Sequence, residues 1–301
     1  LRLGVEVTGL DRHAHEHMTH DGEPVRYDRL VLSTGATPRR LRLPGADLPG
    51  VHYLRTLDDS DALRAVFRPG TNVVVVGAGW IGLETAAAAR GAGATVTVLE
   101  SAELPLLRVL GPRMAQVFAG LHRENGVDLR LGVTVSAVRG GPSAVTGVEL
   151  GDGSVIAADA VVVGVGVSPN VDLARSAGLD VDDGVLVDAS LRSSDSRIFA
   201  VGDVANAQHP VLGRRIRVEH WANALHQPEV VAKSVLGQDA VYDRLPYFFT
   251  DQYDLGMEYV GHAPRDARVV FRGDVPGRQF TAFWVDDDDR VLAGMNVNIW
   301  E

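Results

Sequence analysis

The sequence predicts an α/β fold in which two Rossmann-like domains are followed by a small α+β C-terminal domain. Residues 71–100 give strand, glycine-rich turn, helix and strand in succession, the order typical of a parallel sheet. Two further buried apolar runs, 30–32 and 160–163, each lead directly into a loop that contains glycine. From about Pro246 onward, apolar and polar residues alternate as in a small antiparallel sheet.

The stretch 71–100 carries the strongest motif in the chain. The apolar, β-branched run 73–76 predicts a strand buried on both faces, and it leads into the sequence GAGWIG at 77–82. In this spacing Gly77 permits a tight turn, Gly79 lets a pyrophosphate approach the backbone, and Gly82 lets the next helix pack on the strand. The N–H groups that begin this helix suit a phosphate. We therefore predict a dinucleotide site; the alternative is a glycine turn that only packs the helix.

Glu100 closes this unit at the end of its second strand. It lies near the offset of roughly 20 residues at which a carboxylate binds the adenosine ribose hydroxyls. A carboxylate there would repel a 2′-phosphate, and the next arginine is Arg108. NAD is therefore favoured over NADP.

Turn and loop signals divide the rest of the chain. We expect hairpins around Asp21-Gly22, at 140–141 and at 151–153, and a helix over about 113–125. The linker LRLPGADLPG at 41–50, rich in Pro and Gly, predicts a domain boundary near residue 45. The expected domains are the first part of one Rossmann-like domain at 1–45, a nucleotide-binding domain at 46–163, the second part of the first domain at 164–243, and a C-terminal domain at 244–301.

Composition narrows the function classes. The 301 residues include 29 basic and 39 acidic ones, a net charge of −10, which argues against nucleic acid or an anionic membrane as a main partner. The chain has no cysteine, so it can form neither a disulfide nor a redox-active cysteine pair. No apolar run approaches the roughly 18–20 residues of a membrane span. We expect a cytoplasmic enzyme, and we expect a segment of the same protein upstream of Leu1, because the chain opens in mid-sheet.

Two clusters contain residue types that can bind metal ions, and for each the alternative is an ordinary surface turn. His13, His15 and His17 alternate as on one strand face, with His20 nearby, and could bind a metal. They flank a turn without an evident partner, so a solvated hairpin is favoured. The run DDDD at 286–289 is too short for an ordered calcium loop and is read as a turn. No metal site is predicted.

Six motifs in order resemble one known family. They are STGATPR, VVVVGAGWIGLE, GVGVSPN, IFAVGDVA, VEHWANA and PYFFTDQYDLGMEYVGH. This set is similar to the FAD-dependent ferredoxin reductases that feed electrons to cytochrome P450 and aromatic-ring dioxygenase systems. The resemblance implies the glutathione-reductase type of fold, with one Rossmann-like domain for FAD and one for NAD. The family pattern also contains an FAD glycine loop before the position of Leu1 and a segment after Glu301.

The resemblance implies an FAD site made from segments outside the NAD domain. Asp203 would bind the ribityl hydroxyls, and the start of the helix at His220-Trp221-Ala222 would face the flavin O2 and N1 edge. The alternatives are a helix cap for Asp203, core packing for Trp221, and a plain strand exit for 34–39. The implied FAD residues are Thr34, Gly35, Arg39, Gly202, Asp203, His220, Trp221 and Ala222.

The resemblance also places Glu84 near the nicotinamide carboxamide. The alternative is an exposed Glu in the first helical turn that complements the helix dipole. Flavin would carry the chemistry while Glu84 and Trp221 tune it, so no classical catalytic residue is predicted. The predicted NAD residues are Gly77, Gly79, Trp80, Ile81, Gly82, Glu84, Glu100, Gly164, Val165 and Gly166.

The implied partner is an acidic 2Fe–2S ferredoxin that binds transiently to a monomer or weak dimer. Basic residues gather before and on the helix that follows His220, and an acidic ferredoxin could dock there. The predicted docking residues are Arg214, Arg215, Arg217 and Lys233. Alternatives are a related reductase with rubredoxin, a quinone or dioxygen as acceptor, a flavoprotein of the apoptosis-inducing-factor kind that acts by association, or a nucleotide-binding fragment.

Overall fold

The computed structural model describes residues 1–300 and contains a sheet of five parallel strands. The chain divides into two units. Unit 1 comprises Leu1–Thr37 and Ser168–Phe248, and unit 2 comprises Pro38–Val167 and the segment from Phe249 onward. Each is described by itself. The predicted last domain, 244–301, ends at Glu301, which lies outside the described residues.

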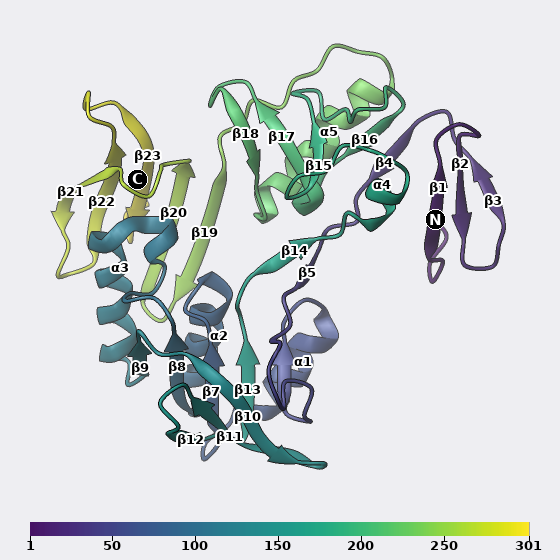
Figure 1. Cartoon of the computed structure of the whole chain (residues 1–301). Helices are drawn as coiled ribbons and strands as arrows, with labels where there is room; N and C mark the ends of the chain where they lie inside the picture. Colours follow the sequence, from purple (N-terminus) through teal and green to yellow (C-terminus); the bar gives the residue numbers. More distant parts are fainter. Residues whose placement is uncertain (301) are drawn as a thin grey trace. The chain divides into compact units, whose positions relative to one another are not determined.

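The sheet of unit 2 has the strand order β6-β13-β7-β8-β9 (Figure 1). Each neighbouring pair is parallel. Its strands are β6 (Val51–Tyr53), β7 (Asn72–Val76), β8 (Thr95–Glu100), β9 (Asp128–Leu131) and β13 (Ala160–Val163). Residues 73–76 and 160–163 are buried throughout, as the apolar runs predicted, because both faces of these strands are covered.

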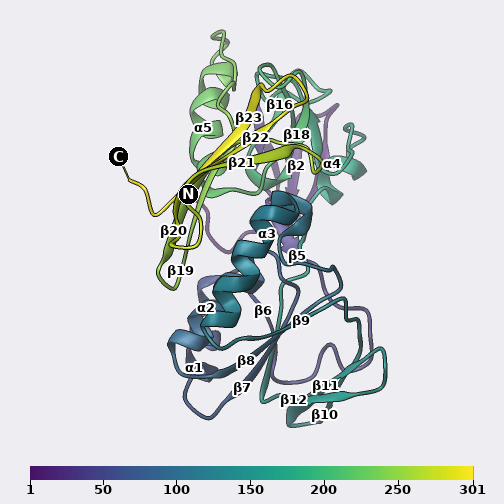
Figure 2. The same cartoon turned by 90° about the vertical axis from the view of Figure 1, so that its left-hand side faces the viewer.

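Helices lie beside this sheet in the order expected of a Rossmann-like unit (Figure 2). They are α1 (Leu57–Val66), α2 (Trp80–Gly91) and α3 (Leu107–Glu124). A meander of β10 (Val135–Gly141), β11 (Ala144–Leu150) and β12 (Val155–Ala157) packs through Val148 on Val74 and Val76. The hairpins predicted at 140–141 and 151–153 are confirmed by the β10-β11 and β11-β12 pairings.

A second sheet of unit 2 is antiparallel and has the order β19-β20-β23-β22-β21. Its strands are β19 (Tyr247–Gln252), β20 (Leu255–Gly261), β21 (Arg268–Asp274), β22 (Gln279–Val285) and β23 (Val291–Val297). The alternation after Pro246 predicted these strands. The expectation of an α+β domain was wrong for the described residues, because 247–300 contain no helix. This sheet packs on α3.

The helix α3 is interrupted where it meets this sheet. Gly111 has a φ of 74°, and Pro112 then begins the second helical segment, a position that tolerates its missing N–H. The predicted helix over 113–125 corresponds to that second segment. Trp284 of β22, which is 1% exposed, donates from Nε1 to the carbonyl oxygen of Leu110 over 3.1 Å at the break.

Unit 1 contains small sheets and two helices. Its parallel pair joins β4 (Leu30–Leu32) to β16 (Ile198–Ala200), which contribute Leu32, Ile198 and Phe199 to the core. The hairpin predicted around Asp21-Gly22 is confirmed by the pairing of β2 and β3. The remaining elements are β1 (Val7–Asp11), β2 (Glu16–Thr19), β3 (Pro24–Arg26), α4 (Asp172–Ser176), β15 (Val185–Val187), the 3-10 helix η1 (Gly202–Val204), β17 (Ala205–His209), β18 (Arg214–Arg217) and α5 (Trp221–Val235).

The chain changes unit between residues 37 and 38, 167 and 168, and 248 and 249. The first two changes fall in β5 (Ala36–Pro38) and β14 (Val167–Pro169), which pair with each other. The domain boundaries expected at 45, 163 and 243 stay predictions.

The substitution Trp284→Phe should destabilise the protein by about 1–3 kcal/mol, because it leaves the buried Leu110 carbonyl without the indole donor. Trp300, which is 64% exposed, provides the matched control, and Trp300→Phe should change the free energy of unfolding by less than about 0.5 kcal/mol. Urea denaturation of the purified protein measures both values. Equal losses in the two variants would contradict the role given to the indole.

Candidate functional site

The glycine turn after β7 is fixed by backbone contacts that leave no room for side chains. A Cβ on Gly77, whose φ is +100°, would lie 2.5 Å from the carbonyl oxygen of Gly164, in the loop after β13. A Cβ on Gly82 would overlap the carbonyl oxygen of Gly77. Because β7 and β13 are parallel neighbours, their carboxyl ends bring these two loops together. The predicted NAD residues in the two loops therefore share one edge of the sheet.

Gly79 is different, because a Cβ there would meet no atom within 4 Å. It is the N-cap of α2, no side chain in the described part of the chain caps this helix, and the first turn has no acidic residue. The start of α2 thus combines open space at Gly79 with N–H groups that no side chain caps, the arrangement that receives a phosphate at a helix N-terminus. Ile81 is 46% exposed beside them, while Trp80 packs edge-on against Phe118 with ring centroids 5.4 Å apart.

Glu100 at the end of β8 is held against the glycine turn. Its Oε2 accepts a hydrogen bond from the Ala78 N–H over 2.8 Å, and its Oε1 accepts from the Ala102 N–H over 2.8 Å. Oε1 also accepts from the Ser101 hydroxyl over 3.1 Å. Since a carboxylate offers about four acceptor positions, Glu100 keeps capacity for about one further donor, such as a ribose hydroxyl. Its position follows from the parallel pairing of β7 with β8.

The loop after β13 is anchored by Arg39. The Gly166 carbonyl accepts from the Arg39 N–H over 2.9 Å, and the Val167 carbonyl accepts from Arg39 Nε over 2.9 Å. Arg39 was predicted for FAD, yet it lies in unit 2 with the NAD residues. Val165 is 38% exposed in the same loop.

Glu84 is partly buried on α2 rather than exposed, so the alternative of a solvated first-turn residue is wrong. Burial raises the pKa of its carboxyl group. The Thr250 hydroxyl, which donates to Oε1 over 2.5 Å, lowers that pKa, and the charge of Asp251 raises it. Thr250 belongs to β19, so the C-terminal sheet contributes to the candidate NAD site.

The predicted FAD residue Asp203 is the middle residue of η1, not a helix cap. Gly202, before it, donates its N–H to Gln227 Oε1 on α5 over 2.7 Å. Arg217 Nη1 donates to the Asp203 carbonyl oxygen over 3.2 Å. The backbone of the Gly-Asp turn is thus held from two sides, and the Asp203 side chain keeps partial exposure.

The start of α5 presents an exposed aromatic side chain. Trp221 is 67% exposed, so the core-packing alternative is wrong. His220 is the N-cap of α5 and contacts Phe248 with ring centroids 4.6 Å apart and planes tilted by 47°, while Ala222 is buried. The start of α5 could therefore present an N–H donor and a helix dipole to a ligand.

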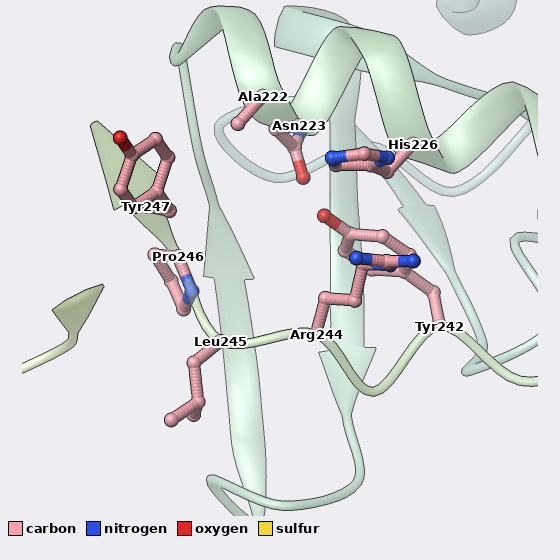
Figure 3. Close-up of a pocket in the computed structure, with 8 residues that line it drawn as sticks. All are labelled: Ala222, Asn223, His226, Tyr242, Arg244, Leu245, Pro246 and Tyr247. Carbon is pink, nitrogen blue, oxygen red and sulfur yellow. The ribbon is translucent and has the colours of Figure 1, made fainter. Parts of the chain in front are cut away.

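A pocket of about 140 Å³ lies beside this helix start. Figure 3 shows Asn223 and His226 pointing from α5 toward Tyr242 and Arg244. Ligand pockets usually measure about 300–1,000 Å³, so this one is too small for a dinucleotide.

Thr34 and Gly35 lie between β4 and β5, and both are paired with Asn170. The Thr34 hydroxyl donates to the Asn170 carbonyl over 2.7 Å, Asn170 Nδ2 donates to the Thr34 carbonyl over 2.8 Å, and the Asn170 N–H donates to the Gly35 carbonyl over 2.9 Å. These contacts fix the strand exit. They connect the motif STGATPR, through Thr34 and Gly35, to the motif GVGVSPN, through Asn170, and all three residues lie in unit 1.

The four basic residues predicted for partner docking differ in exposure and in their hydrogen-bond and ion-pair partners. Arg217 is 10% exposed at its side chain and is paired with Asp183 over 3.3 Å and with Glu219 over 2.5 Å. Lys233 pairs with Glu229 over 3.0 Å on the surface of α5. Arg215 Nη1 donates to the Val187 and Asn206 carbonyls, and Arg214 is exposed. The exposed members of the cluster are therefore Arg214, Arg215 and Lys233, while Arg217 is nearly enclosed.

The histidine cluster at the N-terminal hairpin does not lie on one strand face. His13 and His15 fall in the turn between β1 and β2, and His17 lies in β2. Within residues 1–300, no group of three or more His, Cys, Asp or Glu is placed to hold a metal. Residues 286–289 form the turn before β23.

Sequence reasoning missed the buried polar residues that support the site. Gln227, Thr250, Gln252 and His122 are each at most 2% exposed. Thr250 and Gln252 lie two positions apart, so they share one face of β19. Polar side chains on the inward face of a strand are the signal that could have identified them.

The comparisons with known proteins agree with this arrangement. The family profile described as pyridine nucleotide-disulphide oxidoreductase matches residues 1–227, and a reductase C-terminal profile matches 247–299. In the described residues, no helix is both long and apolar enough to cross a membrane.

Relatives of known function are similar over nearly the whole chain. The ferredoxin–NAD(+) reductase component of the anthranilate 1,2-dioxygenase system of Burkholderia cepacia is 42% identical, over 99% of this chain and 73% of the relative. The ferredoxin reductase for the CYP199A2 system of Rhodopseudomonas palustris superposes with a TM-score of 0.93 at 39% identity, over 98% of this chain and 73% of that one. The covalent putidaredoxin reductase–putidaredoxin complex gives a TM-score of 0.94 at 37% identity, over 98% and 72%. The chain therefore belongs to the pyridine nucleotide-disulphide oxidoreductase family, in the branch formed by the ferredoxin–NAD reductases of oxygenase systems.

Proposed function

We propose that this protein transfers electrons from NADH through FAD to a 2Fe–2S ferredoxin that serves a monooxygenase or dioxygenase. The observation that carries the proposal is the edge of the unit 2 sheet, where the open space at Gly79, the carboxylate of Glu100 and the carboxyl group of Glu84 surround the start of α2. FAD, when bound, takes two electrons from NADH and releases them one at a time, which suits an iron–sulfur acceptor.

The residues of unit 2 bind and orient NADH. The first N–H groups of α2 receive the pyrophosphate beside Gly79, and Glu100 accepts from the adenosine ribose hydroxyls. Glu84 accepts from the nicotinamide carboxamide. Trp80, Ile81 and the loop of Gly164, Val165 and Gly166 shape the surrounding wall.

The residues of unit 1 contribute to FAD binding. Asp203 accepts from ribityl hydroxyls, and the backbone contacts of Gln227 and Arg217 keep its turn in place. Trp221 and the positive end of the α5 dipole would lie beside the flavin and would favour negative charge on it. Thr34, Gly35, Gly202, His220 and Ala222 complete this set of proposed residues, and Arg39 acts by anchoring the loop at Gly166.

The ferredoxin binds transiently, and the acidic balance of the chain restricts its docking to a local basic surface. Arg214, Arg215 and Lys233 supply the exposed basic side chains of this surface, while Arg217 is nearly enclosed and is paired with Asp183 and Glu219. A monomeric or weakly dimeric protein and a cytoplasmic location stay predictions.

The function is tested by anaerobic absorbance spectroscopy of the flavin-loaded full-length protein. Stoichiometric NADH should bleach the flavin bands, and addition of oxidised 2Fe–2S ferredoxin should restore them as the ferredoxin is reduced. Bleaching that ferredoxin does not reverse would indicate another acceptor. Absence of bleaching would contradict NADH oxidation itself.

Glu100→Gln should raise the KM for NADH about tenfold, about 1.4 kcal/mol, because a neutral amide replaces a charged acceptor at the ribose. The same change should reduce the preference for NADH over NADPH, since it removes the repulsion of the 2′-phosphate. Glu103→Gln, at an exposed position nearby, is the matched control. Steady-state kinetics with both nucleotides measures the change, and an unaltered KM would remove Glu100 from the ribose site.

Asp203→Asn should weaken FAD retention about tenfold, because the amide is a weaker acceptor for the ribityl hydroxyls than the carboxylate. The exposed Asp243 supplies the control variant Asp243→Asn. Flavin content is measured after extended dialysis of each protein. If Asp203→Asn retained as much FAD as the wild type, the ribityl role would be wrong.

A further inference from the structure

A chain of buried hydrogen bonds runs from Glu84 into the interface between the nucleotide-binding sheet and the C-terminal sheet. The Thr250 hydroxyl donates to Glu84 Oε1 over 2.5 Å, and Gln252 Nε2 donates to Thr250 Oγ1 over 3.2 Å. Gln252 Oε1 lies 2.8 Å from His122 Nε2, and the Tyr253 hydroxyl lies 3.3 Å from His122 Nδ1. All five residues belong to unit 2.

The hydrogen bonds of this series all run in one direction, toward Glu84. Because Gln252 Oε1 can only accept, the hydrogen of a neutral His122 must sit on Nε2, and Nδ1 then accepts from Tyr253. Burial lowers the pKa of His122, which favours this neutral form. Gln252 uses its amide N–H on Thr250, and the Thr250 hydrogen is left to donate to Glu84. The chain thus ends on the carboxylate with every donor directed toward it.

The position of these groups is unusual for a packing interface. His122 and Gln252 are 0% exposed and Thr250 is 2% exposed. Buried polar side chains are costly unless fully paired, and apolar residues of similar shape would pack there at less cost. A set of polar groups that is linked end to end and stops at one partly exposed carboxyl group points to a role at that carboxyl group.

We propose that Thr250, Gln252 and His122 are positioning residues that fix the orientation of Glu84 toward the nicotinamide amide of NADH. This inference rests on the proposed function. It makes the C-terminal sheet part of the NADH site, through β19, rather than a separate appendage. Burial and the charge of Asp251, the neighbour of Thr250 on the same strand, raise the pKa of Glu84, and the Thr250 hydroxyl acts in the opposite direction.

Thr250→Val keeps the side-chain shape and removes the hydroxyl donor. In the flavin-loaded full-length protein, calorimetric titration with NAD⁺ and stopped-flow reduction by NADH should both show about tenfold weaker nucleotide binding. The loss of a donor to the carboxylate raises the pKa of Glu84 further, so the fall in affinity on acidification should begin at a higher pH than in the wild type. Thr250→Ser, which restores the hydroxyl, should return the wild-type affinity and pH profile within about twofold.

Two further variants keep the test specific. Thr281→Val changes a threonine of the same sheet in β22, outside the polar chain, and should match the wild type. Glu84→Gln removes the titrating group, so its nucleotide affinity should lose the acid-dependent step. It also remains testable if Thr250→Val does not fold, because a neutral side chain suits a partly buried position.

The outcomes separate this inference from the proposed function. A wild type that binds NAD⁺ together with a Thr250→Val variant of equal affinity and equal pH profile would overturn the positioning role alone. An acid-dependent step that persists in Glu84→Gln would do the same. A wild type that neither binds NAD⁺ nor is reduced by NADH would overturn both.

Discussion

The close backbone contact among Gly77, Gly82 and Gly164 is the constraint on which the nucleotide site depends. It lets β7, α2 and the loop after β13 meet without side chains between them. The separation of the two loops is set by carbonyl oxygens and not by adaptable side chains, so the start of α2 has one position relative to the sheet. Glu100 then closes the turn from β8 through the Ala78 N–H. A rigid edge of this kind is what a long, flexible dinucleotide requires for a defined orientation.

Local patterns predicted the elements well because their causes are local. The strands 73–76 and 160–163, the glycine turn and the hairpin at Asp21-Gly22 depend on β-branched runs, tight turns and short-range chain reversal. For the C-terminal domain the local pattern was a better guide than the expected α+β class. The alternation of apolar and polar residues predicts strands, and the remaining residues there show no helical period, so the described residues 247–300 contain strands and no helix. Trp221 shows a different limit. Its residue type alone leaves core packing and a ligand-facing role equally open, and only the exposed position of the α5 start separates them.

The residues that sequence reasoning missed act across long separations. Thr250 reaches Glu84 from 166 positions away, and Gln227 reaches Gly202 from 25 positions away. Neither contact belongs to a motif with fixed spacing, because each depends on how whole elements pack. In both cases a motif residue has its backbone or side chain held by a buried polar group that no local pattern connects to it.

The arginines near α5 show why charge counted along a sequence differs from charge offered to a partner. Four basic residues in this region predicted a docking surface. The side chain of Arg217, however, is nearly enclosed and paired with Asp183 and Glu219, and its Nη1 donates a hydrogen bond to the Asp203 carbonyl. Its contribution is to the turn that carries Asp203. Lys233 pairs with Glu229 one turn away on the helix and stays exposed. The basic side chains that an acidic protein would meet at the surface are therefore those of Arg214, Arg215 and Lys233, and not that of Arg217. Because the whole chain is acidic, a small basic surface of this kind favours brief encounters at that place over tight binding.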